Sequence, residues 1–352
     1  MRALTVRPGV ADSASVEEIG EPPESDGPVL VTTLTVGVCG TDAEIVRAEY
    51  GEAPPGEDRL VLGHENLGRV QAAPAGGELA EGDLVVGIVR RPDPVPCPAC
   101  AVGEWDFCRN GRYTEHGIKG LHGFARERWR AEPDAVVRLD PALGLRGVLL
   151  EPATILAKAW DQVDRAAQRG AGLTPHVAVV TGAGPVGLLA ALLGVQRGLE
   201  VHVLDVVEHG PKPDLVGELG AAYHSKPLPD TGVRPDVVVE CTGVAKVVVD
   251  AITCTGPDGI TCLTGLSPAG RSLLVDVGEL NREAVLQNDV VVGSVNANRR
   301  HYQAAAAALA AADQGWLDRL VTRRLPLERY AEALERKPED VKVVLDLAPL
   351  DR

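Results

Sequence analysis

Three side chains that could bind a catalytic metal ion lie in separate stretches of the first 155 residues. Cys39 lies in Gly-Val-Cys-Gly-Thr-Asp, His64 lies in Gly-His-Glu, and Glu151 precedes Pro152 at the start of a helical pattern. A thiolate, an imidazole and a carboxylate can hold Zn²⁺ while the fourth tetrahedral position stays open for water or substrate. Each residue alone could equally be a buried cysteine, a loop histidine or a helix cap. Together they predict a zinc-dependent catalytic site.

A second candidate site is a Gly-rich turn between two apolar patterns. Val177–Thr181 is typical of a strand buried on both faces of a parallel sheet, and Leu188–Gln196 predicts an apolar helix. The Gly-x-Gly-x-x-Gly turn between them lets backbone N–H groups approach a pyrophosphate at the helix N-terminus. We therefore predict a dinucleotide site, the alternative being a strand-to-helix turn without a ligand. The residues expected to contact the cofactor here are Gly182, Gly184, Pro185, Val186 and Gly187.

An acidic residue at the end of the next strand pattern bears on the choice of cofactor. Asp205 lies within Glu200–Val206, near the spacing at which a carboxylate accepts hydrogen bonds from the ribose hydroxyls of NAD. Val206 and Val207 follow it, so no Arg or Lys is immediately at hand for the 2′-phosphate of NADP. This favours NAD, with Val206 beside the ribose and NADP as the alternative. A solvated aspartate at a strand end is the other interpretation.

Length and composition restrict the class of protein. A chain of 352 residues exceeds a typical single core, which favours two domains. The net charge of −15 argues against a nucleic-acid partner. No apolar run is long enough to cross a membrane and no signal peptide is apparent, so we expect a cytoplasmic protein without a membrane partner. The seven cysteines fit thiols and metal binding better than disulfides.

The elements that must position these residues differ between two parts of the chain. Short β patterns broken by Gly and Pro predict a mostly antiparallel domain at Ala3–Val6, Val29–Gly37, Leu67–Ala73 and Asp83–Val89. After the Gly-rich turn, strand patterns alternate with helix patterns, at Asp236–Gly243, Gly259–Leu266 and Asp289–Asn296. Further cofactor contacts are expected at the carboxyl ends of these strands, from Thr264, Gly265, Leu266, Ser294, Val295 and Asn296. An Ala-rich helix is predicted at Tyr302–Ala312, and strand, helix and strand over Leu320–Leu347.

The order of five motifs resembles that of the zinc-dependent medium-chain dehydrogenase/reductase family over nearly the whole chain. The motifs are Gly37–Asp42, Gly63–Val70, Glu81–Gly87, the Glu-Pro turn at Glu151 and Gly182–Gly187. The resemblance implies a mostly β, GroES-like catalytic domain at 1–155 and 315–352. A Rossmann-type, doubly wound parallel sheet at 156–314 would be inserted into it. It further implies catalytic zinc on Cys39, His64 and Glu151, Glu65 as an outer or alternate ligand, and Thr41 as the hydroxyl that relays the substrate proton.

A cysteine-rich stretch resembles the structural zinc lobe of the same family. Cys97, Cys100 and Cys108 match the last three of the four cysteines of that lobe. The expected first position is Pro94, which is a departure from the pattern. Asp93 could supply the fourth ligand, since carboxylates can join thiolates on zinc. A lobe without metal is the alternative.

Two further segments resemble the sugar-oxidising glucose dehydrogenase branch of the family. By the match over Glu115–Phe124, Glu115 would bind sugar hydroxyls, the alternative being an exposed loop acid. By the match over Gly293–Ala306, Asn296 and His301 would reach nicotinamide or substrate. His301 could instead be a solvated residue at a helix start. Thr41 and Glu151 are expected to contact the substrate as well.

The resemblance implies an oxidoreductase that transfers hydride from C1 of a glucose-like aldose to NAD(P), giving a lactone. The cofactors would be Zn²⁺ and NAD, and the partners would be a small sugar or polyol and further copies in a homodimer or homotetramer. One alternative is a zinc-dependent alcohol or polyol dehydrogenase. The other is a nucleotide or sugar sensor without turnover.

Overall fold

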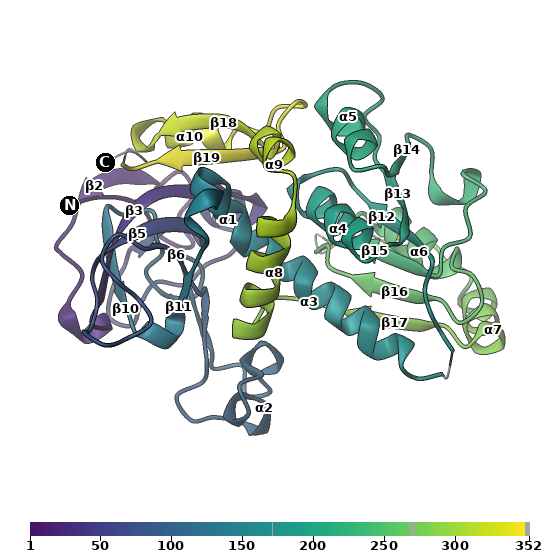
Figure 1. The fold of residues 1–352 in the computed structure, drawn as a ribbon, viewed down its shortest axis with the longest axis horizontal. Coiled ribbons are helices and arrows are strands. Elements are labelled where there is room, and N and C mark those ends of the chain that lie inside the picture. The colour runs from purple at the N-terminus through teal and green to yellow at the C-terminus, as the bar shows by residue number, and fades with distance from the viewer. Residues whose placement is uncertain (171, 268–269, 271, 349–352) are drawn as a thin grey trace. The chain divides into compact units, whose positions relative to one another are not determined.

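The computed structural model describes residues 1–170, 172–267, 270 and 272–348, which fall into two compact units (Figure 1). Unit 1 consists of Met1–Glu151 and the chain from Ala297 onward, and unit 2 is Pro152–Asn296. The first boundary lies close to the predicted residue 155. The second lies earlier than the predicted residue 315, because the helix that follows Ala297 packs in unit 1, where the Tyr302 hydroxyl accepts a 3.1 Å hydrogen bond from Val89 N.

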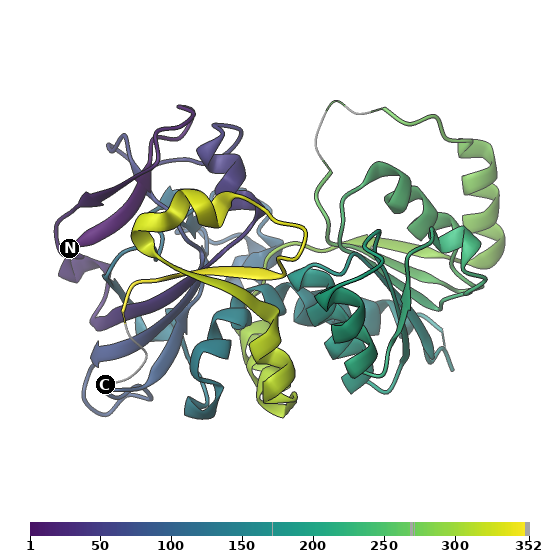
Figure 2. The same cartoon turned by 90° about the horizontal axis from the view of Figure 1, so that it is seen from above.

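Unit 1 is built on a sheet ordered β11-β6-β5-β3-β19-β18, with β10 also paired to β3. All neighbours in it are antiparallel except β18 and β19. The sheet brings together strands from both ends of the chain, as the purple and yellow ribbons in Figures 1 and 2 show. The strands are β3 (Val29–Val38), β5 (Glu65–Ala72), β6 (Leu84–Gly87), β10 (Arg128–Ala131), β11 (Val136–Arg138), β18 (Val321–Pro326) and β19 (Lys342–Asp346).

Two small sheets complete unit 1. One is ordered β2-β1-β4 and the other β7-β8-β9. Their strands are β1 (Arg2–Val6), β2 (Ser15–Glu18), β4 (Leu60–Val61), β7 (Arg90–Arg91), β8 (Thr114–His116) and β9 (Gly120–Leu121). The predicted mostly antiparallel domain is therefore confirmed.

The core of unit 1 follows from β-branched and aromatic residues on the main sheet. Val31 and Val36 of β3, Val85 of β6 and Trp129 of β10 are all buried in one apolar cluster. Burial of such side chains removes apolar surface from water, and this favours the sheet over an extended chain. Phe124 contributes to the same cluster and meets Trp129 edge to face, with ring centroids 4.8 Å apart.

The helical segments of unit 1 are mostly short. The exception is α8, which begins with a capping box formed by Asn298 and His301. The α-helices are α1 (Gly40–Val46), α2 (Pro98–Ala101), α8 (Arg299–Ala311), α9 (Gln314–Leu320) and α10 (Tyr330–Leu334). The 3-10 segments are η1 (Glu24–Asp26), η2 (Trp105–Phe107), η3 (Pro133–Ala135), η4 (Pro141–Leu149) and η6 (Leu327–Arg329).

Unit 2 is a six-stranded parallel sheet, within the described residues, ordered β14-β13-β12-β15-β16-β17. This is the strand order of a doubly wound dinucleotide-binding fold, as the sequence predicted. Its strands are β12 (Val177–Thr181), β13 (Glu200–Leu204), β14 (Ala222–His224), β15 (Val237–Glu240), β16 (Ile260–Leu263) and β17 (Val290–Gly293). The helical segments are α3 (Leu150–Ala167), α4 (Pro185–Gln196), α5 (Pro211–Glu218), α6 (Ala245–Thr253), α7 (Val277–Gln287) and η5 (Leu228–Asp230).

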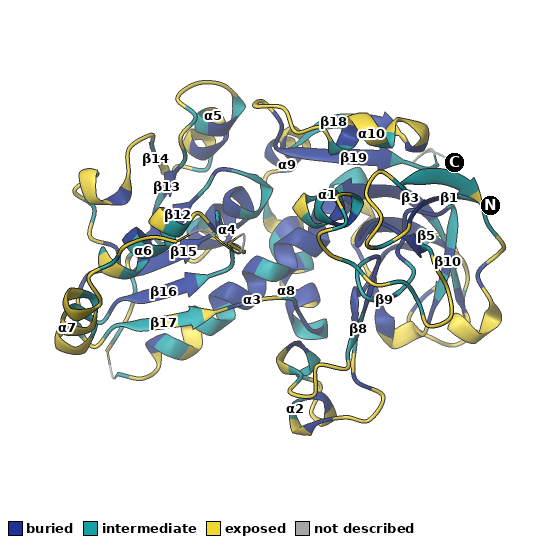
Figure 3. Ribbon diagram, turned by 180° about the vertical axis from the view of Figure 1, so that it is seen from behind, coloured by how far each residue is buried: buried dark blue, intermediate teal, exposed yellow. Residues whose placement is uncertain are grey.

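The central strands of unit 2 are buried on both faces, which explains their unbroken apolar sequences. On one face Val179 of β12 and Val238 of β15 pack with Ala251 of α6. Trp160 of α3 donates a 3.2 Å hydrogen bond to Ala190 O and thereby joins α3 to α4. Figure 3 shows β15 and β16 as buried and α7 as largely exposed. Over the described part of the chain, no helix combines the length and apolarity that a bilayer crossing requires.

Candidate functional site

The pairing of β3 with β5 brings the candidate metal ligands together. Gly37 of β3 lies opposite Glu65 of β5, so Cys39, just beyond β3, meets His64, just before β5. The Cys39 Sγ atom is 3.1 Å from His64 Nε2, and one donor atom from each of Cys39, His64 and Glu65 lies within 4.8 Å of the others. A Cβ on Gly37 would lie 2.0 Å from Glu65 Oε2, so only glycine leaves room for this carboxylate.

The electrostatics of this cluster favour a cation. Burial lowers the pKa of His64, but the charges of Cys39 and Asp42 outweigh burial and hold this pKa well above its ordinary value. His64 Nδ1 lies 3.7 Å from Asp42 Oδ1, and neither buried atom has a hydrogen-bond partner among the described residues. A site that stabilises positive charge on an imidazole also suits Zn²⁺, with Asp42 orienting the ring from behind. The donor set therefore fits the predicted metal.

Glu65 is fixed by a residue distant in sequence. Lys342 Nζ lies 2.7 Å from Glu65 Oε1 and 2.5 Å from Oε2, and both side chains are buried. Burial lowers the pKa of Lys342, but the charges of Glu65 and Cys39 outweigh it and raise this pKa above its ordinary value. Because both oxygens of Glu65 face an ammonium group, Glu65 acts as a fixed negative charge beside the cluster. Its direct binding of zinc stays a prediction.

Glu151 lies outside the group of donor atoms within 4.8 Å but shares its electrostatic environment. It is the second residue of α3 and is buried. Burial raises its pKa to about 7, opposed by the charge of His64 and assisted by that of Glu65. A cation near these residues would favour the ionised carboxylate. Glu151 as third zinc ligand remains a prediction that these surroundings support.

Glu115, the predicted sugar ligand, is buried in unit 1 and is not an exposed loop acid. Arg90, also buried, lies 3.1 Å from Glu115 Oε1 through Nε and 3.0 Å through Nη2. The Arg90 guanidinium also stacks on the Tyr113 ring, 3.7 Å from its centroid. The charge of Glu115 acts on Glu151, which places the two acids in a common environment. Thr41, the predicted proton relay, lies in the first turn of α1 beside Cys39.

The three cysteines of the lobe form a second cluster. One Sγ atom from each of Cys97, Cys100 and Cys108 lies within 4.8 Å of the others, and Cys97 and Cys100 are buried. Hydrogen bonding from Arg109 N lowers the pKa of Cys97 to about 6, whereas burial raises that of Cys100 to about 11. A group of three thiols at this spacing suits zinc better than a packing role.

Asp93 does not join the cysteine cluster in this structure. Its Oδ1 atom accepts from Val95 N at 2.8 Å, and its Oδ2 atom accepts from Asn110 Nδ2 at 2.8 Å and Arg112 Nε at 3.2 Å. The carboxylate is thus engaged with the backbone and side chains of its own loop. Asp93 as fourth ligand remains a prediction that requires these bonds to rearrange.

His301 is buried in unit 1 at the start of α8 and is not solvated. Its Nδ1 atom accepts a 3.2 Å hydrogen bond from Asn298 N in the capping box. The same ring atom is 4.0 Å from Asp106 Oδ2, and Asn298 Nδ2 donates to Asp106 Oδ1 at 2.7 Å. The helix cap explains the position of His301, and its contact with substrate stays a prediction.

The Gly-rich turn of unit 2 has the geometry of a dinucleotide site. Gly182 has φ +85, a left-handed conformation that favours glycine. A Cβ on Gly187 would lie 1.8 Å from Gly182 O, so the third glycine permits helix and strand to pack closely. Gly184 caps α4, Pro185 is the first residue of the helix, and a Cβ on Gly184 would point into open space. These glycines, with Val186 between them, leave the N-terminus of α4 open to an anion.

Asp205 follows β13, and its Oδ1 atom accepts a 3.3 Å hydrogen bond from Val207 N. Its Oδ2 atom accepts a 2.7 Å hydrogen bond from Ala183 N and lies 3.5 Å from Lys212 Nζ. Lys212 is buried in α5, whereas Val206 is exposed. The carboxylate therefore lies beside the Gly-rich turn, and its charge is partly balanced by an ammonium group seven residues farther along the chain.

The remaining predicted cofactor residues follow β16 and β17. Thr264 donates through Oγ1 to Glu240 O at 2.7 Å and thus helps to shape the turn after β16. Gly265 N also donates to Glu240 O, at 3.0 Å, and Leu266 is exposed. Ser294 is buried, Val295 is exposed, and Asn296 has a left-handed φ of +61. Their contact with cofactor stays a prediction.

Sequence reasoning missed three residues that shape the site. Asp42 lies three residues after Cys39, so its proximity to the metal cluster could have been inferred from the motif. Arg90 lies in Val89–Pro92, which also resembles the glucose dehydrogenase branch, but its contact with Glu115 depends on the pairing of β7 with β8. Lys342 lies 277 residues from Glu65, and no local signal in the sequence predicts their contact.

Comparison with known proteins covers both units. Residues 25–141 match the family described as the alcohol dehydrogenase GroES-like domain, and residues 145–347 match that described as the glucose dehydrogenase C-terminus. The chain is 40% identical over 352 residues to a glucose 1-dehydrogenase of Thermoproteus tenax, with 99% of each chain covered. It is 38% identical to a glucose 1-dehydrogenase of Methanocella arvoryzae, again with 99% of each covered.

Solved structures give the same result. Haloferax mediterranei glucose dehydrogenase, solved with NADP, Zn and gluconolactone, superposes with a TM-score of 0.91 at 33% identity. That comparison covers 99% of this chain and 100% of the other. Galactitol-1-phosphate dehydrogenase from Escherichia coli has a TM-score of 0.80 at 23% identity, with 99% and 100% covered, which shows a shared fold.

Proposed function

Because this chain belongs to the zinc-dependent medium-chain dehydrogenase/reductase family and to its glucose dehydrogenase branch, we propose that it oxidises C1 of a glucose-like aldose to a lactone. The observation that carries the proposal is the cluster of half-buried Cys39 with buried His64 and Glu65, in the same unit as the buried acid Glu115. The first three suit a catalytic metal, and the fourth suits a polyhydroxylated substrate.

The residues of unit 1 would have separate roles in the reaction, in binding the metal and in transferring the substrate proton. Cys39, His64 and Glu151 would hold zinc, which supplies Lewis acidity that lowers the pKa of a substrate hydroxyl. Lys342 holds the Glu65 carboxylate in place beside these residues. The Thr41 hydroxyl would receive the substrate proton and pass it onward. A bound nicotinamide cofactor would supply the acceptor for the hydride.

Glu115 would select the substrate class. Arg90 binds its Oε1 atom and fixes the carboxylate in position, so the group could accept hydrogen bonds from two sugar hydroxyls. An alcohol without those hydroxyls would leave a buried carboxylate with fewer partners, which costs binding energy. This is the reason to prefer an aldose to the simple alcohols and polyols of the alternative function.

The proposal is tested with a panel of aldoses, polyols and simple alcohols, measured by reduction of the cofactor. We expect aldoses to give the highest kcat/KM, and Glu115→Ala to raise KM for the best aldose by at least about tenfold. The exposed Glu132→Ala is the matched control and should leave kinetics unchanged. A wild-type enzyme inactive on every aldose but active on a polyol would support the alternative, and one that turns over nothing would support a sensor.

For the cofactor we propose a preference for NAD over NADP. Asp205 lies beside the Gly-rich turn, and the adjacent Val206 offers no positive charge to a 2′-phosphate. Lys212 balances part of the Asp205 charge and so limits the preference for NAD. We still expect kcat/KM to be at least about tenfold higher with NAD than with NADP. Removal of that balance by Lys212→Met should strengthen the preference.

Steady-state kinetics with both cofactors decides this second point. The double variant Asp205→Gly with Val206→Arg should reverse the preference, because it removes the carboxylate and adds a bidentate partner for phosphate. A wild-type enzyme that works better with NADP contradicts the proposal.

We further propose that the chain forms a homo-oligomer through β17 and α7. β17 is the edge strand of the unit 2 sheet, and Val291 on it is 47% exposed. Val285 and Leu286 of α7 are 67% and 64% exposed. An unpaired edge beside exposed apolar side chains favours association with a second copy.

A further inference from the structure

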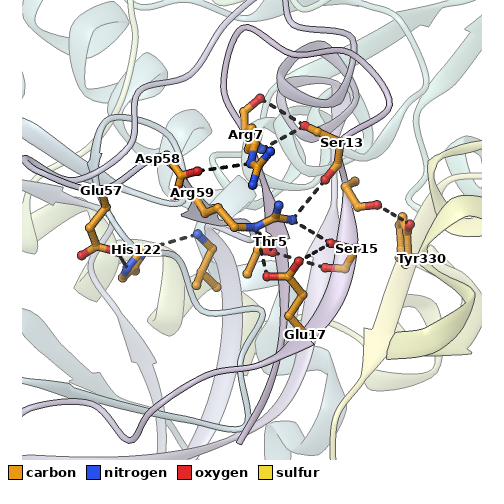
Figure 4. Close-up of polar contacts among 12 residues, drawn as sticks. Thr5, Arg7, Ser13, Ser15, Glu17, Glu57, Asp58, Arg59, His122 and Tyr330 are labelled. Carbon is orange, nitrogen blue, oxygen red and sulfur yellow. Dashed lines mark hydrogen bonds and ion pairs between the residues drawn. The ribbon is translucent and has the colours of Figure 1, made fainter.

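Unit 1 contains a cavity of about 600 Å³ that none of the predicted metal ligands lines. Its walls come from the β1–β2 region, from the loop before β4 and from residues 116–130. The volume is in the range of pockets that hold small metabolites. Figure 4 shows one wall, with Arg59 held by Thr5, Ser13, Ser15 and Glu17, and His122 beside Glu57.

The acidic residues of this cavity are exposed and, with one exception, already paired. Glu17 pairs with Arg59, Glu57 with the Nε2 atom of His122, and Asp58 with Arg7. Their side chains are 38%, 52% and 77% exposed. Glu21 pairs with Arg128, which does not line the cavity. The remaining acid, Asp26, is exposed and forms no ion pair among the described residues.

Two of the basic residues that line the cavity, Arg126 and Arg91, show the opposite arrangement. Arg126 is 4% exposed, its Nε atom is buried without a hydrogen-bond partner, and among the described residues its guanidinium makes no ion pair. Arg91 donates only to Ile88 O, at 2.7 Å, and likewise pairs with no acid in the described chain. Burial lowers the pKa of both side chains to about 10. Two arginines thus line one cavity without an acidic partner at contact distance.

Three of the other buried cations in the described residues have such a partner. Lys342 binds Glu65, Arg90 binds Glu115, and Lys212 lies 3.5 Å from Asp205. Asp26 and Glu57 act on Arg126 through their charges, but no described residue accepts a hydrogen bond from its buried Nε atom. A buried donor without an acceptor carries a desolvation cost, which a ligand oxygen would relieve. The cavity beside Arg126 provides the space for one.

We propose that this cavity binds a compact oxyanion, a phosphate or carboxylate group, whose oxygens accept hydrogen bonds from Arg126 and Arg91. Planar guanidinium groups present paired N–H donors that match either group. The paired, exposed acids lie around it and can accept from hydroxyls attached to the anion. The site therefore takes a small anionic metabolite and is distinct from the metal cluster and from the Gly-rich turn of unit 2.

Isothermal titration of the zinc-loaded enzyme with inorganic phosphate and, separately, with succinate tests the site. Saturation with the nicotinamide cofactor occupies the pyrophosphate site beforehand, and a chloride titration at matched ionic strength corrects for screening. We expect one binding event per chain for phosphate, succinate or both. Tighter phosphate binding identifies a phosphate ligand, and tighter succinate binding a carboxylate ligand.

Arg126→Met should weaken binding of the anion at least tenfold. Arg138→Met changes an exposed arginine outside the cavity and should leave the affinity for the anion unchanged. Arg91→Met is expected to weaken binding in the same direction and serves if Arg126→Met does not fold. Absence of binding to the wild-type enzyme up to about 50 mM of either anion overturns the proposal. So does binding that survives in both arginine variants.

Discussion

Fixed cations set the charge of the catalytic site residue by residue. Lys342 holds Glu65, and Arg90 holds Glu115, so both side chains are fixed in position within the core. Breaking a buried pair by removal of one partner typically costs about 3 to 5 kcal/mol, so the fold depends on both members of each pair. The predicted metal ligands Cys39 and His64 thus lie in the same unit as acidic side chains that are already held in place.

The first prediction concerns Cys39. Cys39→Ala removes the thiolate from the predicted ligand set and should lower kcat at least about a hundredfold, with loss of one zinc per chain. Affinity for the cofactor should stay within about twofold, because the Gly-rich turn lies in unit 2. The measurements are metal content, turnover and cofactor titration.

Cys254→Ala is the matched control, since this thiol lies at the end of α6 and far in sequence from every predicted ligand. It should retain full zinc content and turnover. A Cys39→Ala enzyme that works at nearly the wild-type rate after zinc depletion would show that the metal mechanism is wrong.

The predicted metal ligands could be identified from residue types in the sequence, but the side chains that contact the site from distant segments could not. Cys39 and His64 belong to motifs whose chemistry is visible in the sequence. Lys342 reaches Glu65 only because β19 pairs with β3 in the folded sheet, with Val344 opposite Gly37. Pairing between distant strands depends on tertiary packing, which local sequence patterns do not encode.

Among the elements, the Gly-rich turn contains two glycines, Gly184 and Gly187, that are needed for different physical reasons. Gly187 provides space for Gly182 O, whereas Gly184 faces open space with an ordinary φ of −78. Close packing of helix and strand therefore depends on Gly187, and access of a ligand to the turn depends on Gly184.

We expect Gly187→Ala to destabilise the protein by about 2 to 4 kcal/mol, because its methyl group would overlap the backbone. Gly184→Ala should change the free energy of unfolding by less than about 1 kcal/mol and should weaken cofactor binding instead. Denaturant unfolding and cofactor titration of both variants check this. Equal stability losses in the two variants would contradict the assigned roles.

The lobe around α2 extends from the main sheet of unit 1 (Figure 1) and contains the three clustered thiols. If these thiols hold zinc, Cys100→Ser should lower Tm by about 5 °C or more and remove one zinc per chain. Turnover at low temperature should persist, because the metal supports folding and not the reaction. A fully active wild-type enzyme with a single zinc per chain would show that the lobe binds none.

The sequence predicted the strands better than their ends. β12 has the predicted bounds, Val177–Thr181. β16 ends at Leu263, short of the predicted Leu266, because the N–H groups of Thr264 and Gly265 both turn back to Glu240 O, at 2.8 and 3.0 Å. Apolar residues continue past that point, and only the hydrogen bonds reveal where the ladder stops.

At the scale of the whole molecule, the class of fold was predictable because the sequence patterns of the two units differ. Unit 1 has short strand patterns broken by Gly and Pro, and unit 2 alternates strand and helix patterns. The second boundary was not predictable, since the Ala-rich α8 resembles a helix of an α/β unit. Its place in unit 1 depends on contacts such as Arg299 Nη1 with Asp134 O and the Tyr302 hydroxyl with Val89 N. Helical periodicity identifies a helix but not the sheet against which it packs.

The proposed oligomer gives a prediction at this scale. Val291→Lys adds a charge to the exposed edge strand and should shift the wild-type oligomer toward monomer, with at least about tenfold weaker association. Val10→Lys, at an exposed apolar residue of unit 1, is the control and should leave the mass unchanged. Light scattering at several concentrations measures both. A wild-type enzyme that is monomeric throughout would contradict the proposed interface.

The position of β19 in the unit 1 sheet has a consequence for synthesis on the ribosome. All six strands of unit 2 precede residue 294 and can pair as soon as they emerge. The main sheet of unit 1 must wait for Lys342–Asp346, which fill the gap between β3 and β18 and bring the ammonium group to Glu65. Domains generally fold as units during translation. A nascent chain would therefore be able to form its nucleotide-binding fold before β19 completes the unit 1 sheet beside the predicted metal site.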